Sequence, residues 1–258
     1  MIRPYIALIF TSALLVMSTA SAKETKSISF CEDPWPPYTY GAHGEVPEKG
    51  YAVDFLNEVS KRIDVKFSMT LLPWKRCLLM AKNGSIDGVM LLTKNNKRER
   101  YLEFTVPLIS DNNLLWFRSD QNLAANSWDS FEDLKSYRIG VVAGFNYGEA
   151  FIKAKEEYNF NIEVVNDVKS NFKKLALGRI DVFFVNLSAA NEVLKEEHEF
   201  KDKFKFLDKL FEKVPFYIGI SKNSQARFLL PDINKAINSM IRDGTIERIM
   251  KQFPDQRP

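Results

Sequence analysis

Two stretches of the chain decide the fold: AKNGSIDGVML at residues 81–91 and LALGRIDVFFV at residues 175–185. Each reads as the end of a helix, a glycine, an Ile-Asp pair and a short apolar run, and the two copies lie about 94 residues apart. Gly84 and Gly178 can adopt the left-handed backbone that ends a helix, and the apolar runs are typical of strands buried in a parallel sheet. The repeat therefore predicts two similar α/β lobes. The alternative is two ordinary helix-to-strand turns within one sheet.

The path of the chain between the lobes can be placed from this repeat. Phe104-Thr105-Val106-Pro107 is where we expect the chain to leave the first lobe, and residues 216–221 read as a strand that returns toward it. We therefore assign residues 23–109 and 214–258 to the first lobe and residues 110–213 to the second. Proteins built from paired α/β lobes usually bind their ligand between them, so the function is expected in that cleft.

Residues 1–22 have the pattern of a secretory signal peptide. A single charge, Arg3, precedes an apolar stretch, and Ala20-Ser21-Ala22 supplies the small residues of a cleavage site. This pattern predicts a periplasmic protein that is cleaved after about Ala22. The alternative interpretation of the apolar stretch is a membrane anchor.

Cys31 and Cys77 are the two cysteines of the sequence, and both follow the predicted signal peptide. In an oxidising compartment such a pair is expected to form a disulfide. Closing a loop of this length would stabilise the fold by roughly 4 kcal/mol in the chain-entropy model. Two reduced, buried thiols are the alternative.

The composition argues against several classes of partner. The formal net charge is +3 and basic residues are interspersed with acidic ones, so no basic stripe indicates nucleic-acid binding. With two histidines, His43 and His198, and no clustering of cysteine and histidine, the ligands of a structural zinc site are missing. We expect no metal and no cofactor.

The order and spacing of several motifs resemble one known family. The motifs are an aromatic-proline loop at residues 33–38, then GYAVDFL, PWKRCLLMAKNGSIDG, KNNKRERYLEFTVPL, RIGVVAGFNYGEAF, LALGRIDVFFV and RDGTIERIMKQF. The chain is similar to the family 3 extracellular solute-binding proteins, the polar amino-acid type of periplasmic binding protein. The resemblance implies a two-lobed type II α/β fold. Each lobe would be a mostly parallel sheet flanked by helices, with two crossover strands as the hinge.

The resemblance also implies a mechanism and partners. Hinge closure would trap a small polar solute, and a monomeric protein would deliver that solute to an ABC-type permease in the inner membrane.

Several first-lobe positions match ligand-binding positions of the family. Trp35 matches an aromatic residue that stacks on the ligand, with Tyr38 beside it. Arg98 matches the arginine that grips the ligand carboxylate through two parallel hydrogen bonds, and Thr93 matches a hydroxyl on the same carboxylate. Trp74 and Arg76 fall where the family has cleft-lining residues, although Arg76 could equally face solvent.

In the second lobe, Phe145 and Asn146 follow a strand and precede a helix, where free N–H groups attract anions. Asn146 is the expected polar contact, and Phe145 departs from the threonine that is frequent there. Asn186 stands where an aspartate normally binds the α-ammonium of an amino acid. Because an amide cannot neutralise that charge, the site either recruits another acid, with Glu32 and Asp33 as candidates, or binds a solute without an ammonium.

Two other functions remain open from the sequence. An enzyme on this fold, similar to the cyclohexadienyl dehydratases, would need an acid such as Glu32, Asp33 or Glu45. No Ser-His-Asp order or nucleotide-binding motif supports catalysis, so we do not expect an enzyme. Alternatively, the liganded protein could be read by a membrane signalling receptor.

Overall fold

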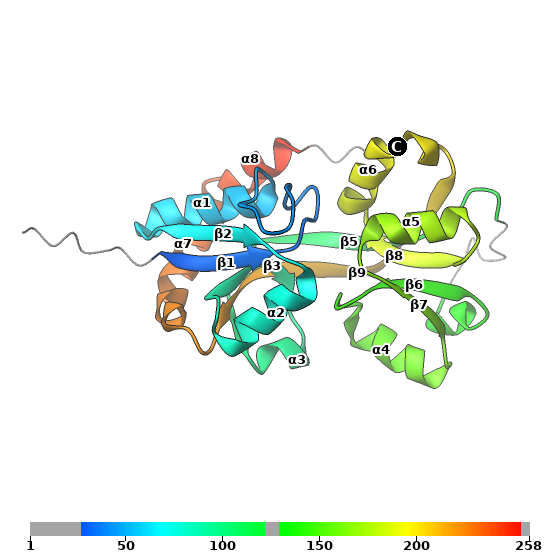
Figure 1. Ribbon diagram of the computed structural model, residues 1–258, viewed down its shortest axis with the longest axis horizontal. Coiled ribbons are helices and arrows are strands. Elements are labelled where there is room, and N and C mark those ends of the chain that lie inside the picture. Colours follow the sequence, from blue (N-terminus) through cyan, green and yellow to red (C-terminus); the bar gives the residue numbers. More distant parts are fainter. Residues whose placement is uncertain (1–26, 122–128, 254–258) are drawn as a thin grey trace, which may run out of the picture.

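The computed structural model describes residues 27–121 and 129–253, so the predicted signal peptide lies outside the described residues. Within these ranges, nine strands form one sheet in the order β2-β1-β3-β9-β5-β8-β6-β7, with β4 beside β9. Figure 1 shows two groups of strands and helices joined by the long strands β5 and β9. The structure thus has the two-lobed α/β fold that the resemblance implies, and its two lobes share a continuous sheet.

The first lobe is built on three parallel strands. Strand β1 lies between β2 and β3, and helix α7 packs against α1 and α8. Helices α1, α2 and α7 each bury an apolar face, although Leu79 and Ile241 are exposed. The elements are β1 (Ile28–Glu32), α1 (Tyr51–Ile63), β2 (Phe67–Leu71), α2 (Trp74–Asn83), β3 (Gly88–Thr93), α3 (Asn96–Glu99), β4 (Leu102–Phe104), η3 (Gln225–Leu229), α7 (Leu230–Arg242) and α8 (Thr245–Lys251).

The second lobe repeats this pattern. Strand β6 lies between β7 and β8, parallel to both, and helix α5 packs on the sheet and against α6. The elements are η1 (Phe131–Leu134), β6 (Arg138–Val142), α4 (Gly148–Glu157), β7 (Asn161–Val165), α5 (Val168–Ala176), β8 (Val182–Asn186), α6 (Leu187–Glu196) and η2 (His198–Phe200).

The crossover strands are β5 (Ile109–Arg118) and β9 (Phe204–Ser221), which run antiparallel to each other. Strand β5 also pairs with β8, and β9 pairs with β3, so each crossover strand joins the sheet of one lobe. Strand β9 is longer than the 216–221 strand expected from the sequence. It extends back to Phe204 because it follows β5 along its length, through a register shift between Asn113 and Leu115.

The repeated stretch has the same structural role in both lobes. Gly84 and Gly178 take positive φ angles of 74° and 62°. The aspartate of each copy then accepts a backbone N–H from the neighbouring parallel strand, at 2.8 Å in both cases: Asp87 from Ser29 and Asp181 from Arg138. The Ile-Asp pair therefore sets the register between the strand that follows it and the first strand of its lobe.

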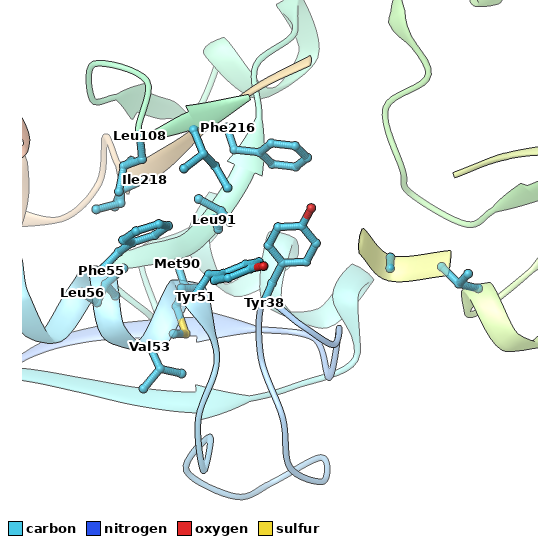
Figure 2. Packing of buried hydrophobic residues seen from close by; sticks show 14 of the residues in the cluster. Tyr38, Tyr51, Val53, Phe55, Leu56, Met90, Leu91, Leu108, Phe216 and Ile218 are labelled. Carbon is cyan, nitrogen blue, oxygen red and sulfur yellow. The ribbon is translucent and has the colours of Figure 1, made fainter. Parts of the chain in front are cut away.

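The loop that follows β1 packs into the core of the first lobe. Figure 2 shows Tyr38 next to Tyr51 and Phe216, and the Tyr38 ring lies 5.6 Å from that of Tyr51 and 5.8 Å from that of Phe216.

The predicted disulfide between Cys31 and Cys77 is confirmed, and it ties β1 to α2. No helix within residues 27–121 and 129–253 is both long enough and apolar enough to cross a membrane.

Candidate functional site

A small cavity of about 50 Å³ lies between the lobes. Its walls come from the ends of β1, β3 and β8, from α2, α3, β5 and β9, and from the loop after β6. It is lined by Glu32, Asp33, Trp35, Trp74, Leu91, Leu92, Thr93, Arg98, Asn113, Phe145, Asn146, Tyr147, Phe184, Val185, Asn186, Val214 and Phe216.

Arg98 enters this cavity from the short helix α3. Asn95 caps this helical turn by accepting the backbone N–H of Arg98 at 2.9 Å. The Arg98 side chain is only 4% exposed. The N-cap thus fixes the backbone that points a guanidinium into the cleft.

Three N–H groups of Arg98 are engaged by protein oxygens. Nη1 donates to the carbonyl oxygen and the hydroxyl of Thr93, at 2.6 and 2.8 Å, and Nη2 donates to the carbonyl oxygen of Gly144 at 3.0 Å. The Nε–H and the second N–H of Nη2 have no hydrogen-bond partner among the described residues. They are the pair of donors that a carboxylate can accept side by side.

The positive charge of Arg98 is not balanced by an ion pair. In the described part of the chain no carboxylate oxygen lies within 4.0 Å of the guanidinium. The guanidinium instead lies over the Trp74 ring, 5.3 Å from its centroid. Burial lowers the pKa of Arg98 to about 10, so the side chain is still protonated at neutral pH. A buried cation of this kind favours an anionic ligand.

Glu32 is the second buried ionisable group of the cavity. It ends β1, is 1% exposed, and accepts the backbone N–H groups of Asp33 and Leu91 at 3.1 and 3.0 Å. Burial raises the pKa of its carboxyl to about 8, against the lowering effect of those two hydrogen bonds and of the Arg98 charge. Before a ligand binds, burial therefore favours the neutral form of Glu32 at neutral pH.

Asp33, the other candidate acid, is already partnered. Its Oδ1 lies 2.9 Å from Nε2 of His43. Burial raises the pKa of Asp33, and the hydrogen bond to His43 opposes that rise. Asp33 lies where the cavity opens toward solvent, because it also lines a second hollow of about 210 Å³.

Trp35 lines the cavity as the sequence predicted, but Tyr38 does not. The two rings stack with centroids 4.1 Å apart, so Tyr38 supports Trp35 from behind. Tyr38 is buried, and its hydroxyl donates to Asp111 at 2.5 Å. The stacking also places Trp35 edge-on against Phe145. Its Nε1 is buried and has no hydrogen-bond partner in the described residues.

Residues 144–146 close the cavity from the second lobe. The Gly144 carbonyl accepts from Arg98 and also from Nε1 of Trp74, at 3.0 Å in both cases. The Asn146 amide bridges the lobes by donating to the Lys94 carbonyl at 3.2 Å, and its oxygen accepts the Gly148 N–H at 3.2 Å. The N–H of Phe145 is taken by the Val142 carbonyl, so it is not the free anion donor that was expected.

Asn186 lies on the cavity wall and caps helix α6. Its Oδ1 accepts the Ala189 N–H at 2.8 Å. The neighbouring strand brings Asn113 opposite Asn186 in the β5–β8 ladder. Sequence reasoning missed Asn113, although the polar run Asp111-Asn112-Asn113, which follows the predicted exit from the first lobe, was an available signal.

Arg76 does not belong to the site. It is exposed on α2, whereas Trp74 and Cys77 of the same helix are buried. Its position on the helix turns it away from the cavity, so the solvent-facing alternative is correct. The remaining residues that sequence reasoning missed are Tyr147, which precedes α4, and apolar or aromatic residues of β3, β8 and β9 whose patterns are typical of ordinary core. Residues 27–121 and 129–253 contain no cluster of acidic, histidine or cysteine side chains that could hold a metal ion.

Comparison with known proteins identifies the family of the chain. A model of the bacterial extracellular solute-binding proteins, family 3, matches residues 28–256. The chain belongs to this family. Among family 3 relatives, the histidine-binding periplasmic protein of Escherichia coli (strain K12) is 27% identical over 261 residues, which cover 95% of each chain. The L-cystine-binding protein TcyJ of the same strain is 24% identical over 225 residues, 86% of this chain and 80% of the relative.

Solved structures share the family 3 fold. An ancestral arginine-binding protein bound to arginine aligns with a TM-score of 0.73 at 21% identity, over 88% of this chain and 97% of that one. A histidine kinase sensor domain with similarity to periplasmic binding proteins aligns with a TM-score of 0.74 at 17% identity, over 88% and 96%. These likenesses establish the two-lobed fold, within which this family 3 member acts as a solute-binding protein.

Proposed function

We propose that this family 3 protein captures a small carboxylate-bearing solute in the cavity between its lobes. The observation that carries the proposal is the state of Arg98: within residues 27–121 and 129–253, its buried, protonated guanidinium has no carboxylate partner, and two of its N–H donors have no acceptor. A solute carboxylate would supply the missing counter-charge. Relatives named for binding histidine, arginine and cystine support an amino-acid-like solute.

The test is a thermal-shift screen of amino acids, short amino carboxylates, dicarboxylates and opines, followed by titration calorimetry of each compound that stabilises the protein. A ligand that binds the folded state raises the stability by RT ln(1 + [L]/Kd). Arg98→Ala should abolish detectable binding, and Arg98→Lys should weaken it at least tenfold, since lysine cannot form the bidentate pair.

Arg76→Ala is the matched control. It removes an arginine from the exposed face of α2 and should leave the affinity unchanged. If Arg98→Ala bound the ligand as tightly as Arg76→Ala, the proposed role of Arg98 would be wrong.

We also propose the cellular context of this binding. Residues 1–22 would be removed after about Ala22, and the mature monomer would act in the periplasm and deliver its solute to an ABC-type permease. Residues 23–109 with 214–258, and 110–213, would move as the two rigid lobes, because the boundaries fall within the crossover strands β5 and β9. Loss of solute uptake in a deletion strain, restored by the wild-type chain and not by Arg98→Ala, tests the transport role.

Catalysis is the second candidate, since a buried carboxyl that is neutral near pH 7 can serve as a general acid. We propose that the protein binds without turning over its ligand. Incubation of prephenate and arogenate with the protein at micromolar concentrations should leave both compounds intact. Aromatic products that depend on Glu32 would establish the enzyme instead.

A further inference from the structure

The cavity contains two buried charge-bearing groups that do not pair with each other. Arg98 and Glu32 both line it, yet no ion pair joins them within 4.0 Å, and each influences the pKa of the other only through space. Both oxygens of Glu32 accept backbone N–H groups. Each carboxylate oxygen has a further acceptor site, and the cavity is the open volume that these sites can face.

Asn186 cannot take the place of the family's aspartate. Its amide oxygen already accepts the Ala189 N–H at the start of α6 and carries no negative charge that could balance an ammonium, and its NH₂ group is a donor, which repels an ammonium. Asn113, opposite it in the sheet, is also neutral. Among the cavity residues, the acids are Glu32 and Asp33, and Asp33 is paired with His43.

The size of the cavity limits what can lie between the two groups. A volume of about 50 Å³ holds roughly four water molecules, at about 10–15 Å³ for each. Trp74 is held against Gly144 and Trp35 against Phe145, so the aromatic walls leave little room for expansion. A ligand of this size that contacts both Arg98 and Glu32 must carry its charges only a few bonds apart.

We propose that Glu32 is the residue that receives the cationic group of the solute, in place of the residue at position 186, and that the cavity selects compact zwitterions. This inference rests on the proposed binding function. The solute carboxylate pairs with Nε and Nη2 of Arg98, and its ammonium donates to the Glu32 carboxylate. Because Glu32 is mainly protonated in the empty cavity, its proton leaves to solvent when the cation arrives, and the liganded cavity is electrically balanced. Asp33 and Arg98 are the charged groups that act on Glu32 in this exchange.

The experiment compares matched pairs of probes by titration calorimetry. Glycine, β-alanine and 4-aminobutyrate carry both charges, whereas acetate, propionate and butyrate carry the carboxylate alone. Titration at pH 7 in buffers of different ionisation enthalpy counts the protons released. We expect at least one amino carboxylate to bind at least tenfold more tightly than its partner, with the release of close to one proton, and the carboxylate to bind without release.

Two variants test whether Glu32 causes the preference for amino carboxylates. In Glu32→Gln the preference and the proton release should both vanish, while binding of the simple carboxylate through Arg98 persists and shows that the site is folded. Asn186→Ser keeps a side chain that can cap α6 and should retain the preference and the proton release.

Several results would overturn the inference. They are equal binding of both members of every pair, an unchanged preference in Glu32→Gln, a loss of preference in Asn186→Ser, or failure of all three amino carboxylates to bind. Tighter binding of a long cationic amino acid such as arginine would also overturn it, because that ligand must reach past Trp35 and Phe145 into the second hollow. A ligand that needs Arg98 but has no cationic group would refute the role of Glu32 and leave the proposed binding function intact. If no compound bound in an Arg98-dependent way, the proposed function itself would fail.

Discussion

The indole N–H of Trp74 donates to the carbonyl oxygen of Gly144 at 3.0 Å, and this bond joins α2 of the first lobe to the loop after β6 of the second. An added Cβ at Gly144 would lie 2.9 Å from Cδ1 of Trp74. Gly144 also has a φ of 83°, which a side chain disfavours. The absence of a side chain at residue 144 therefore permits this contact between the lobes.

Gly144→Ala should hold the lobes apart. We expect a larger radius of gyration by small-angle X-ray scattering, and an affinity about tenfold lower for whichever compound the screen identifies, the equivalent of roughly one net hydrogen bond. Gly244→Ala is the matched control, because Gly244 has a similar φ of 74° with no atom within 4 Å of an added Cβ. It should lose comparable stability with no change in scattering or affinity. Identical behaviour of the two variants would show that the Trp74 contact is unimportant for closure.

Glu32 makes the stability of the unliganded protein depend on pH. Burial raises the pKa of Glu32 from an ordinary 4.5 to about 8. The folded state therefore binds this proton more tightly than the unfolded state does. The resulting stability is fully present below about pH 4.5 and is lost as the pH rises through about 8. At about 1.4 kcal/mol per pH unit, the loss is on the order of 5 kcal/mol at most.

Urea unfolding between pH 5 and 9 measures this dependence for the wild type and Glu32→Gln. The wild type should lose stability relative to Glu32→Gln as the pH rises, because Glu32 ionises in the wild type and glutamine cannot ionise. Parallel pH profiles would mean that Glu32 titrates near its ordinary pKa.

The Cys31–Cys77 disulfide joins residues 46 positions apart, and both cysteines are fully buried. In the chain-entropy model a closed loop of this size stabilises the fold by roughly 4 kcal/mol. Reduction in mild denaturant should therefore lower the midpoint of thermal unfolding, and the double variant Cys31→Ala/Cys77→Ala should show a similar loss that is insensitive to reductant. Two reactive thiols in the native oxidised protein would contradict the bond.

The fold could be predicted because its signals are local and repeated. Gly84 and Gly178 end helices for the same steric reason in both lobes, and the apolar runs that follow them form buried strands. Asp87 and Asp181 show why the repeat includes an aspartate, since each carboxylate binds the neighbouring strand. The extension of β9 back to Phe204 could not be predicted, because it depends on pairing with a distant strand and not on an apolar pattern.

The site was predicted less completely, because a motif gives a position and not a side-chain direction. Arg98 and Tyr38 both matched family positions, yet one points into the cavity and the other stacks behind Trp35. The helical phase of α2 could have excluded Arg76, because Trp74, Cys77 and Ala81 form the buried face of this helix and Arg76 is not on it. The N-cap roles of Asn95 and Asn186 were also available from the sequence as polar residues that directly precede helices.

Asn171 offers a test of core packing in the second lobe. It is 0% exposed on α5, and in the described structure neither its Nδ2 nor its Oδ1 has a hydrogen-bond partner. Unpaired buried polar atoms cost about 1–3 kcal/mol. Leucine has the same branching as asparagine, so Asn171→Leu should raise the free energy of unfolding by roughly 1–2 kcal/mol in urea titrations.

The gain in the free energy of unfolding is limited because Asn171 lies close to Gly140 on the adjacent strand. A Cβ added at Gly140 would lie only 2.5 Å from Oδ1 of Asn171. This distance shows how closely the asparagine approaches the sheet. Asn171→Ala, which removes the polar atoms and leaves a cavity, separates the two effects and should stabilise less than Asn171→Leu. If both variants were less stable than the wild type, the Asn171 amide would have to be hydrogen-bonded in solution, by a buried water that bridges it to the backbone.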